Sequence, residues 1–344
     1  MPGAGRGSLL LANLLASLLR SAVAFSAWQS DMLSEQGPII AVMAQPYGNV
    51  PDYLPASYVK WLELGGARVV PIMYEATDRE VDTIFANTNG LLLIGGAAPI
   101  CSAARRFLSN AVEAAKAGDA YPIWGTCDGF EWLMQMASEE DGVLHGGFDS
   151  ENLPLPLDLT AAAASSRLLA EAGDTMAQRS PKLSVLEALG SLPVTFNSHK
   201  QGVTPAAFAA SAPLSAFFTV LATNRDRKGR SFVSMVEAVD PRLRVYATQF
   251  HPEKNLFEWG QAASGELLQA IPHSRAAVAV SQYFANFFVD ECRASAHRFA
   301  SPTDQWKQLI YHSPHWLAQP TLFSPNFVES YVFGASRPNG TRNR

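Results

Sequence analysis

A single cysteine lies between two glycines where a buried strand is expected to give way to a helix. Residues 124–131 read Trp-Gly-Thr-Cys-Asp-Gly-Phe-Glu, and their first two residues end the apolar run 121–125. A Gly-x-Cys-x-Gly turn at such a junction is the cysteine form of the nucleophile elbow, because a Cβ on either flank would crowd the sharp turn. The positive end of the following helix is expected to lower the pKa of the Cys127 thiol. The alternative is an inert, buried cysteine in a glycine-flanked turn.

A cysteine nucleophile needs a base that takes and returns its proton. His251 follows the strand-like segment 244–250, and Glu253 lies two residues later, where it can orient the imidazole and stabilise its cation. His199, in Asn-Ser-His-Lys after another strand-like segment, is a second candidate for the same site. The other histidines lie in polar or tail contexts without a carboxylate at this spacing.

Two backbone N–H groups are candidate donors to the oxyanion that forms when the thiolate attacks a carbonyl. One belongs to Asp128, directly after the cysteine, and the other to Gly96, which ends the strand-like segment 90–96. One such donor contributes about 3 kcal/mol to stabilisation of the transition state. Taken alone, Gly95-Gly96 would be interpreted as an ordinary tight turn.

The elements that must position these residues alternate between strands and helices. Short apolar runs predict strands at 38–43, 67–73, 90–96 and 121–125, and helical spacing predicts helices at 53–64, 78–87 (capped by Asp78) and 103–117. This order predicts an α/β fold, a doubly wound and mostly parallel sheet with helices on both faces. Functional residues then collect at the carboxyl ends of its strands.

The second half of the chain completes one catalytic domain, expected over residues 28–300. Residues 139–192 interrupt the alternation of strands and helices, which suggests a surface excursion that covers the site. Strand-like segments return at 193–196, 217–223, 231–237 and 244–250, and a long helix is expected at 274–296. Residues 301–344 are aromatic and interrupted by proline, which predicts an extended arm and tail.

Composition excludes several classes of protein. The 344 residues are 48% hydrophobic and 17% charged, unlike a disordered chain. A net charge of −5 without a basic run argues against nucleic-acid binding. No Cys-x-x-Cys, His-Glu-x-x-His, dinucleotide or P-loop pattern occurs, so neither a metal nor another cofactor is expected. Three cysteines leave at least one thiol free, and whether Cys101 and Cys292 pair stays open.

The first 27 residues are expected to be a signal peptide rather than part of the fold. Arg6 precedes an apolar stretch of about 12 residues, too short to cross a bilayer, and Ala-Val-Ala at 22–24 resembles a cleavage site. An N-terminal core helix or a bipartite organelle-targeting peptide are the alternatives. After its removal no membrane association is expected.

Residues 124–131, together with Gln-Phe-His-Pro-Glu at 249–253, resemble the class I glutamine amidotransferase-like superfamily and, within it, the γ-glutamyl hydrolase family of cysteine peptidases. Supporting segments lie at 53–60, 66–71, 89–96, 198–200 and 309–311. The resemblance runs from about Pro38 to Phe333. In it, Cys127 corresponds to the nucleophile, His251 to the proton donor and Glu253 to the third member of the triad.

The resemblance implies a small-molecule substrate, a folate poly-γ-glutamate whose γ-glutamyl amides are cleaved through a thioester. It also implies a secretory route ending outside the cell, in the lysosome or in the vacuole. Tyr58 and His199 match further positions of the cleft. A polyanionic substrate needs a basic group nearby, for which Lys200 and Lys60 are candidates. A homodimer is left open.

Asp128 departs from the family, which usually has an apolar residue there, often Leu. A carboxylate beside the thiol would raise the pKa of the thiol. Glu131, four residues after the cysteine, agrees with the hydrolases rather than with the amidotransferases, where Gln is common. Two alternatives therefore remain: a glutaminase that supplies ammonia to a synthase, and an inactive binding or storage protein on the same scaffold.

Overall fold

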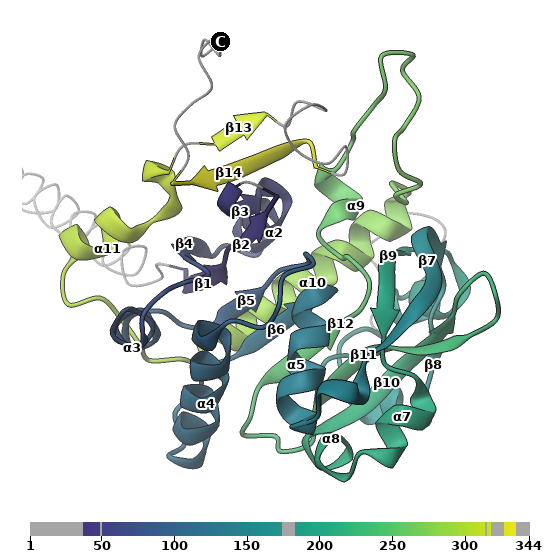
Figure 1. Ribbon diagram of the computed structural model, residues 1–344, viewed down its shortest axis with the longest axis horizontal. Coiled ribbons are helices and arrows are strands. Elements are labelled where there is room, and N and C mark those ends of the chain that lie inside the picture. Colours follow the sequence, from purple (N-terminus) through teal and green to yellow (C-terminus); the bar gives the residue numbers. More distant parts are fainter. Residues whose placement is uncertain (1–36, 49, 174–182, 314, 318–326, 335–344) are drawn as a thin grey trace, which may run out of the picture. The chain divides into compact units, whose positions relative to one another are not determined.

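The apolar runs of the N-terminal half form the parallel centre of an eight-stranded sheet (Figure 1). The structure is a computed structural model that describes residues 37–48, 50–173, 183–313, 315–317 and 327–334. The sheet has the order β4-β1-β5-β6-β12-β11-β10-β8. Its parallel strands are β4 (Arg68–Ile72), β1 (Ile39–Met43), β5 (Leu91–Leu93), β6 (Ile123–Thr126) and β12 (Val245–Thr248). Antiparallel strands continue it: β11 (Ser231–Ala238), β10 (Phe218–Arg225) and β8 (Asp158–Leu159).

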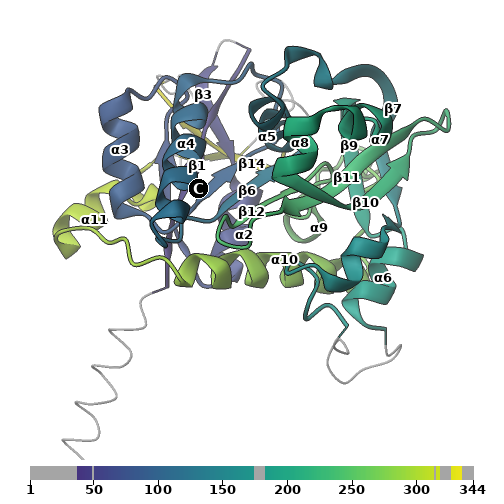
Figure 2. The same ribbon diagram turned by 90° about the horizontal axis from the view of Figure 1, so that it is seen from below.

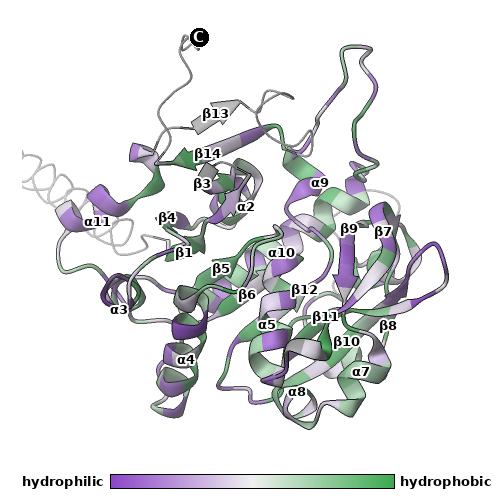
Figure 3. Ribbon diagram, viewed as in Figure 1, coloured by the Kyte–Doolittle hydropathy of each residue, from purple (hydrophilic) through white to green (hydrophobic). Residues whose placement is uncertain are grey.

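Helices cover both faces of this sheet, as the alternating order predicts (Figure 2). Side chains of β1 divide between two cores: Ile40 and Val42 pack on one face, Ala41 and Met43 on the other. The first face is covered by α2 (Ala56–Leu64), α6 (Val185–Ser191) and α10 (Arg275–Arg293). The second is covered by α3 (Asp78–Asn87), α4 (Ser102–Lys116), α5 (Asp128–Ser138), α7 (Pro205–Ala210) and α8 (Ala212–Phe217). The central strands β1 and β5 are hydrophobic along their length, whereas α3 and α4 contain hydrophilic segments (Figure 3). The predicted α/β fold is confirmed.

Two smaller sheets flank the main one. The first has the order β13-β14-β3-β2 and contains β13 (His315–Leu317), β14 (Glu329–Phe333), β3 (Val50–Pro55) and β2 (Gln45–Tyr47). The second pairs β7 (His145–Leu155) with β9 (Thr195–Gly202). Short elements complete the described part: η1 (Asp141–Val143), η2 (Ala161–Ser165), α9 (Lys254–Phe257), α11 (Pro302–Gln308) and η3 (Ile310–His312).

The structure corrects the beginning of two predicted helices. The helix expected at 53–64 begins at Ala56, because Tyr53 and Leu54 belong to β3 and pair with β14, some 280 residues later in the chain. The helix expected to be capped by Asp78 is capped by Thr77, whose hydroxyl accepts from the Glu80 N–H while the Glu80 carboxylate accepts from the Thr77 N–H. This reciprocal capping box satisfies two backbone donors and explains the earlier cap.

Within residues 139–192 the structure has β7, β8 and α6. Two further expectations need correction. His199 does not follow a strand but lies within β9, opposite Ser150 of β7. The expected extended arm contains the helix α11 and then joins the flanking sheet through β14. Strand β9 pairs with β7 and β14 pairs with β3, and both partners lie far away in the sequence, where local patterns carry no information about them.

The expected signal peptide at residues 1–27 lies outside the described residues. From Pro38 onward the chain groups into one compact unit. Within the ranges given above, the helices are too short or too polar to cross a bilayer.

Candidate active site

The predicted cysteine elbow is present between β6 and α5. Cys127 has φ 54° and ψ −106°, a left-handed conformation that a non-glycine residue adopts only under strain. The flanking glycines leave no room for side chains: a Cβ on Gly125 would lie 2.6 Å from the carbonyl oxygen of Gly129, and one on Gly129 would lie 2.3 Å from that of Leu93. Both glycines are therefore required by close backbone approach, which confirms the prediction of a crowded turn.

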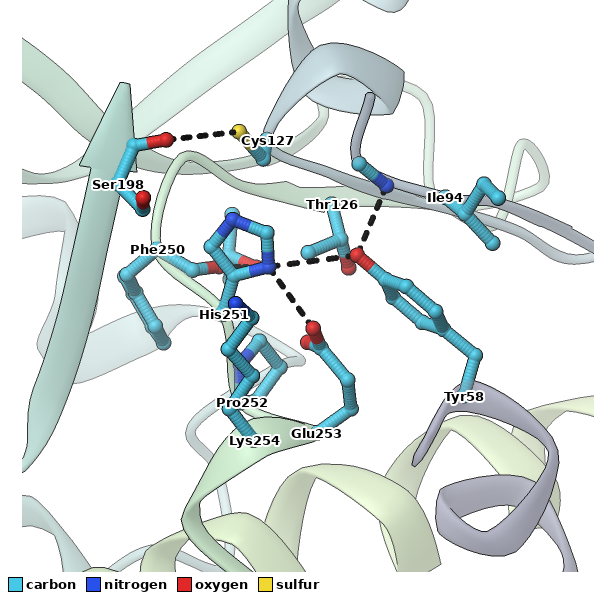
Figure 4. A network of polar contacts seen from close by, with 12 residues as sticks. Tyr58, Ile94, Thr126, Cys127, Ser198, Phe250, His251, Pro252, Glu253 and Lys254 are labelled. Atoms are coloured by element: carbon cyan, nitrogen blue, oxygen red, sulfur yellow. Dashed lines mark hydrogen bonds and ion pairs between the residues drawn. The ribbon is translucent and has the colours of Figure 1, made fainter. Parts of the chain in front are cut away.

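Three neighbouring parallel strands bring the candidate residues together. Strands β5, β6 and β12 are adjacent and run in the same direction, so their carboxyl ends meet at one edge. Gly95 follows β5, Cys127 follows β6, and His251 follows β12 after a short turn. A Cβ built on Gly95 would lie 2.7 Å from Cε1 of His251, 2.8 Å from Oη of Tyr58 and 3.2 Å from Cβ of Cys127. All of these side chains therefore border the same small space (Figure 4).

His251 contacts Glu253, the residue that the sequence predicts to orient it. Nδ1 of the imidazole lies 2.8 Å from Oε1 of Glu253, whose side chain is buried. An ionised carboxylate only accepts hydrogen bonds, so Nδ1 carries the proton and Nε2 is left as the basic nitrogen. In the structure the Cys127 thiol donates to the carbonyl oxygen of Ser198, with Sγ at 3.9 Å from it (Figure 4). The thiol must leave this carbonyl to pass its proton to His251.

Tyr58 of α2 joins this network. Its hydroxyl oxygen accepts from the Gly95 N–H at 2.8 Å and lies 3.3 Å from Nδ1 of His251. The Gly95 N–H is thus occupied and cannot serve an oxyanion. The N–H groups of Gly96 and Asp128 have no hydrogen-bond partner among the residues described, and Gly96 is exposed. The two N–H groups expected from the sequence as oxyanion donors are therefore unoccupied in the described part of the chain, and their role stays a prediction.

The prediction of a lowered thiol pKa is wrong for the free protein. Burial, followed by the carboxyl groups of Glu131, Asp128 and Glu253, raises the pKa of the Cys127 thiol well above its ordinary value. The argument from the helix end omits this desolvation and these like charges. The effect expected of the Asp128 carboxylate on the thiol pKa has the predicted direction.

Two of these carboxyl groups are themselves hard to ionise. Burial raises the pKa of Asp128 to about 7, although hydrogen bonds with the Gln45 side chain and the Ala98 N–H act in the opposite direction. Burial and the neighbouring Asp128 raise the pKa of Glu131 to about 8. The Glu131 carboxyl accepts a hydrogen bond of 3.0 Å from Nε2 of Gln249. At acidic pH both groups are neutral, which weakens their repulsion of a thiolate.

His199 is buried behind the site between the rings of Phe148 and Phe232. Its Nδ1 donates to the carbonyl oxygen of Gln201 at 2.6 Å, while Nε2 is buried without a partner. Burial lowers the pKa of His199 to about 4, so the ring is neutral at physiological pH. His199 therefore offers a hydrogen-bond acceptor rather than a positive charge.

Neither of the two lysines suggested by the sequence lies at this cluster. Lys200 follows His199 on β9 and points to the opposite face, where its 70% exposed side chain pairs with Glu151. Lys60 forms an ion pair with Glu329 of β14. The cation that does lie near the thiol is Lys254, which sequence reasoning missed. Its ammonium is buried, faces the rings of Phe196 and Phe327, and lowers the pKa of the Cys127 thiol.

A signal for Lys254 existed in the sequence, because it directly follows Glu253 in the segment that carries the base. Gln45 was also missed, and nothing in its local sequence marks it. Gln249 begins the motif at 249–253, but its contact with Glu131 was not predicted. Cys101 and Cys292 are free, so they do not pair. Over the described ranges, no three His, Cys, Asp or Glu side chains are grouped as metal ligands would be.

Comparison with known proteins agrees with this geometry. The family described as "Glutamine amidotransferase class-I" matches residues 58–266. "Gamma-glutamyl hydrolase B" of Dictyostelium discoideum is 34% identical over 89% of this chain and 85% of its own length. "Gamma-glutamyl hydrolase" of Mus musculus is 37% identical over 81% of this chain and 84% of its own length. Among solved structures, the glutaminase domain of Trypanosoma brucei CTPS with bound acivicin aligns with a TM-score of 0.46 at 15% identity, covering 75% of this chain and 94% of that one.

The matched region contains the elbow cysteine, the histidine and the glutamate that the structure brings to one edge of the sheet. The identity to the two hydrolases extends over most of the chain, well beyond those motifs. The chain therefore belongs to the γ-glutamyl hydrolase family of class I glutamine amidotransferase-like proteins.

Proposed function

We propose that this protein hydrolyses γ-glutamyl amide bonds of folate poly-γ-glutamates through a thioester on Cys127. The observation that carries the proposal is the assembly around Gly95: the strained elbow cysteine and the Glu253-oriented histidine border one space. The hydrolases named above supply the substrate class. Neither the cysteine nor the histidine would need this arrangement in an inert core.

The reaction follows from the positions of these groups. The Cys127 thiol transfers its proton to Nε2 of His251, and the sulfur attacks the γ-carbonyl carbon. The N–H groups of Gly96 and Asp128 donate to the oxyanion. His251 then protonates the leaving amine, the thioester forms, and the amine departs. Water, deprotonated by His251, attacks the thioester carbonyl and releases the γ-carboxylic acid and the free thiol.

Glu253 and Lys254 supply the electrostatics of these steps. Glu253 accepts from Nδ1 and stabilises the imidazolium that exists between the two proton transfers. The Lys254 ammonium lowers the pKa of the thiol and opposes the three nearby carboxyl groups. It is also the positive charge nearest to the site that could attract the carboxylates of a polyglutamate, the role first assigned to Lys200 and Lys60.

The decisive assay measures the products released from a defined penta-γ-glutamyl folate. The wild-type protein should release glutamate or short γ-glutamyl peptides, and their lengths distinguish cleavage at the end of the chain from internal cleavage. Cys127→Ala should abolish release while its thermal unfolding stays that of a folded protein. Release by Cys127→Ala at the wild-type rate would refute the assignment.

Two controls address the alternatives. Ammonia release from free glutamine would indicate a glutaminase instead. The rate of Cys127 alkylation by iodoacetamide, measured against pH, tests whether the protein is an inactive binding protein. In a working site the pH dependence of this rate should change when His251 is replaced by Ala. In an inert site it should stay the same.

For the localisation of the protein, we propose that it follows the secretory route to the outside of the cell, the lysosome or the vacuole. The proposal rests on the signal-like residues 1–27, and N-terminal sequencing of protein recovered from the medium or from vesicles tests it. A mature N-terminus near Phe25 supports the route, and an intact Met1 contradicts it.

A further inference from the structure

Gln45 lies at the same edge of the sheet as the triad. It follows β1, whose carboxyl end lies beside that of β5, the strand that leads to Gly96. We propose that Gln45 is a positioning residue, whose carboxamide holds the chain at Ile94 and Gly96 and thereby places the Gly96 N–H for the oxyanion. This inference rests on the proposed hydrolysis, and the last experiment below separates the two.

The backbone that carries this carboxamide is itself held in place. In β2, Gln45 pairs with Tyr53 of β3. The preceding residue, Ala44, donates its N–H to the carbonyl oxygen of Ile72 in β4 at 2.9 Å. The Gln45 side chain is completely buried. A side chain packed in this way has little freedom to move, so the carboxamide has a defined position relative to the sheet.

One hydrogen bond fixes the orientation of the carboxamide. Nε2 of Gln45 donates to the carbonyl oxygen of Ile94 at 3.1 Å, and the same oxygen accepts from the Gly129 N–H at 3.0 Å. The reverse orientation would bring two acceptor oxygens together, so Oε1 has to point away from Ile94. Among the described residues, Oε1 is buried without a hydrogen-bond partner.

The carboxamide also lies directly against Gly96. A Cβ on Gly96 would lie 1.8 Å from Oε1 of Gln45, 2.6 Å from Cδ and 3.1 Å from Nε2, and these are its three nearest atoms. Gly96 does not have a positive φ, so a left-handed backbone is not the reason for a glycine here. The carboxamide is the group that excludes a side chain. Gln45 therefore contacts the chain on both sides of Gly95, once by a hydrogen bond and once by packing.

An amide at this position costs stability that an apolar side chain would not. A buried acceptor without a partner destabilises a fold. Methionine has a similar length and no such acceptor, but it cannot donate to the Ile94 carbonyl. Gln45→Met should therefore leave the urea midpoint of unfolding close to that of wild type, although the hydrogen bond that holds Ile94 is lost.

The kinetic test compares kcat and KM of wild type and Gln45→Met on a penta-γ-glutamyl folate. The variant should lower kcat by roughly tenfold or more with a much smaller change in KM, because an oxyanion donor acts mainly in the transition state. A kcat near that of wild type, or a loss confined to KM, would overturn the proposal.

Gln45→Glu tests the hydrogen bond to Ile94 by restoring it conditionally. A carboxyl group can donate to this carbonyl only while it is protonated, and burial favours its neutral form. The kcat of Gln45→Glu relative to wild type should therefore fall between about pH 5 and about pH 8, through the range in which a buried carboxyl loses its proton. The ratio for Gln45→Met should stay constant. Constant ratios for both variants would show that this hydrogen bond does not position the donor.

A further measurement does not depend on activity. Gly96→Ala should lower the urea midpoint, because the buried carboxamide can make room for a Cβ only by leaving the Ile94 carbonyl. In a Gln45→Ala background the obstacle is absent, so Gly96→Ala should cost much less there. Equal costs in both backgrounds would overturn the proposal. If wild type cleaves no γ-glutamyl bond yet the costs differ, the proposed hydrolysis fails while the placement of Gly96 by Gln45 stands.

Discussion

The buried Asp128 carboxyl makes the stability of this protein depend on pH, and Asp128→Asn removes that dependence. Its pKa rises from 3.8 to about 7 on folding, mainly through burial. Between these values the folded state holds a proton that the unfolded state has lost. Stability therefore falls as the pH rises through this interval, and the loss is complete above the folded pKa.

The magnitude follows from the size of this shift. About three pH units at ~1.4 kcal/mol each give a loss of roughly 4 kcal/mol in the free energy of unfolding between about pH 4 and pH 8. Asparagine does not titrate, so Asp128→Asn should gain on wild type by about this amount over the same interval. Removal of the Asp128 charge also lowers the pKa of Glu131, which adds a contribution of the same sign.

Urea unfolding followed by tryptophan fluorescence at several pH values measures this difference. Asp240→Asn is the matched control, because hydrogen bonds with Arg242 lower the pKa of the exposed Asp240 to about 2. That titration is complete by about pH 5, so the control should differ from wild type by a constant amount from about pH 5 to pH 8. A constant difference for Asp128→Asn over that interval would refute the reasoning.

Three further predictions concern the elbow and the charges beside it. Gly129→Ala should destabilise the fold by about 3 kcal/mol or more, because its Cβ would lie 2.3 Å from a backbone carbonyl of β5; the helical control Gly190→Ala, whose nearest contact is an ordinary 3.7 Å, should gain up to ~1 kcal/mol in the same unfolding assay. Glu253→Gln should lower kcat by roughly 10³-fold or more with little effect on KM, since the imidazole loses its orienting carboxylate, and a kcat near wild type would contradict this role. Lys254→Met should move the pH profile of Cys127 alkylation to higher pH, because the ammonium that opposes the nearby carboxyl groups is gone; an unmoved profile would show that this charge does not reach the thiol.

The arrangement of the triad could be predicted from the sequence because each residue follows the end of a parallel strand. Apolar runs located those strands, and the topology of a doubly wound sheet requires their carboxyl ends to lie at one edge. The glycines on both sides of Cys127 were informative as well, because the Gly-x-Cys-x-Gly spacing is itself local. Gly125 approaches the nearby Gly129 carbonyl, whereas the approach of Gly129 to the Leu93 carbonyl of the neighbouring strand follows from the sheet.

The electrostatics of the site could not be predicted in this way. Charges on Glu131 and Asp128 are local to Cys127, but Glu253 and Lys254 reach it from a segment more than a hundred residues later. Burial, the largest effect on the thiol, depends on every element packed around the elbow. Local reasoning about the helix end therefore gave the wrong direction for the thiol pKa.

A thiol that resists ionisation changes how the nucleophile must be activated. A thiolate formed in advance would need a positive environment, yet burial and three carboxyl groups oppose it, and Lys254 alone favours it. We therefore expect the proton to leave as the sulfur attacks, with His251 as the general base of the first step. The oxyanion then carries the negative charge that the thiol could not, so correct placement of the Gly96 and Asp128 N–H groups matters more here than in a site with a preformed thiolate. The chain directly before Gly96 is held accordingly: the Gly95 N–H donates to Tyr58, and the Ile94 carbonyl accepts from the Gly129 N–H and from Nε2 of Gln45.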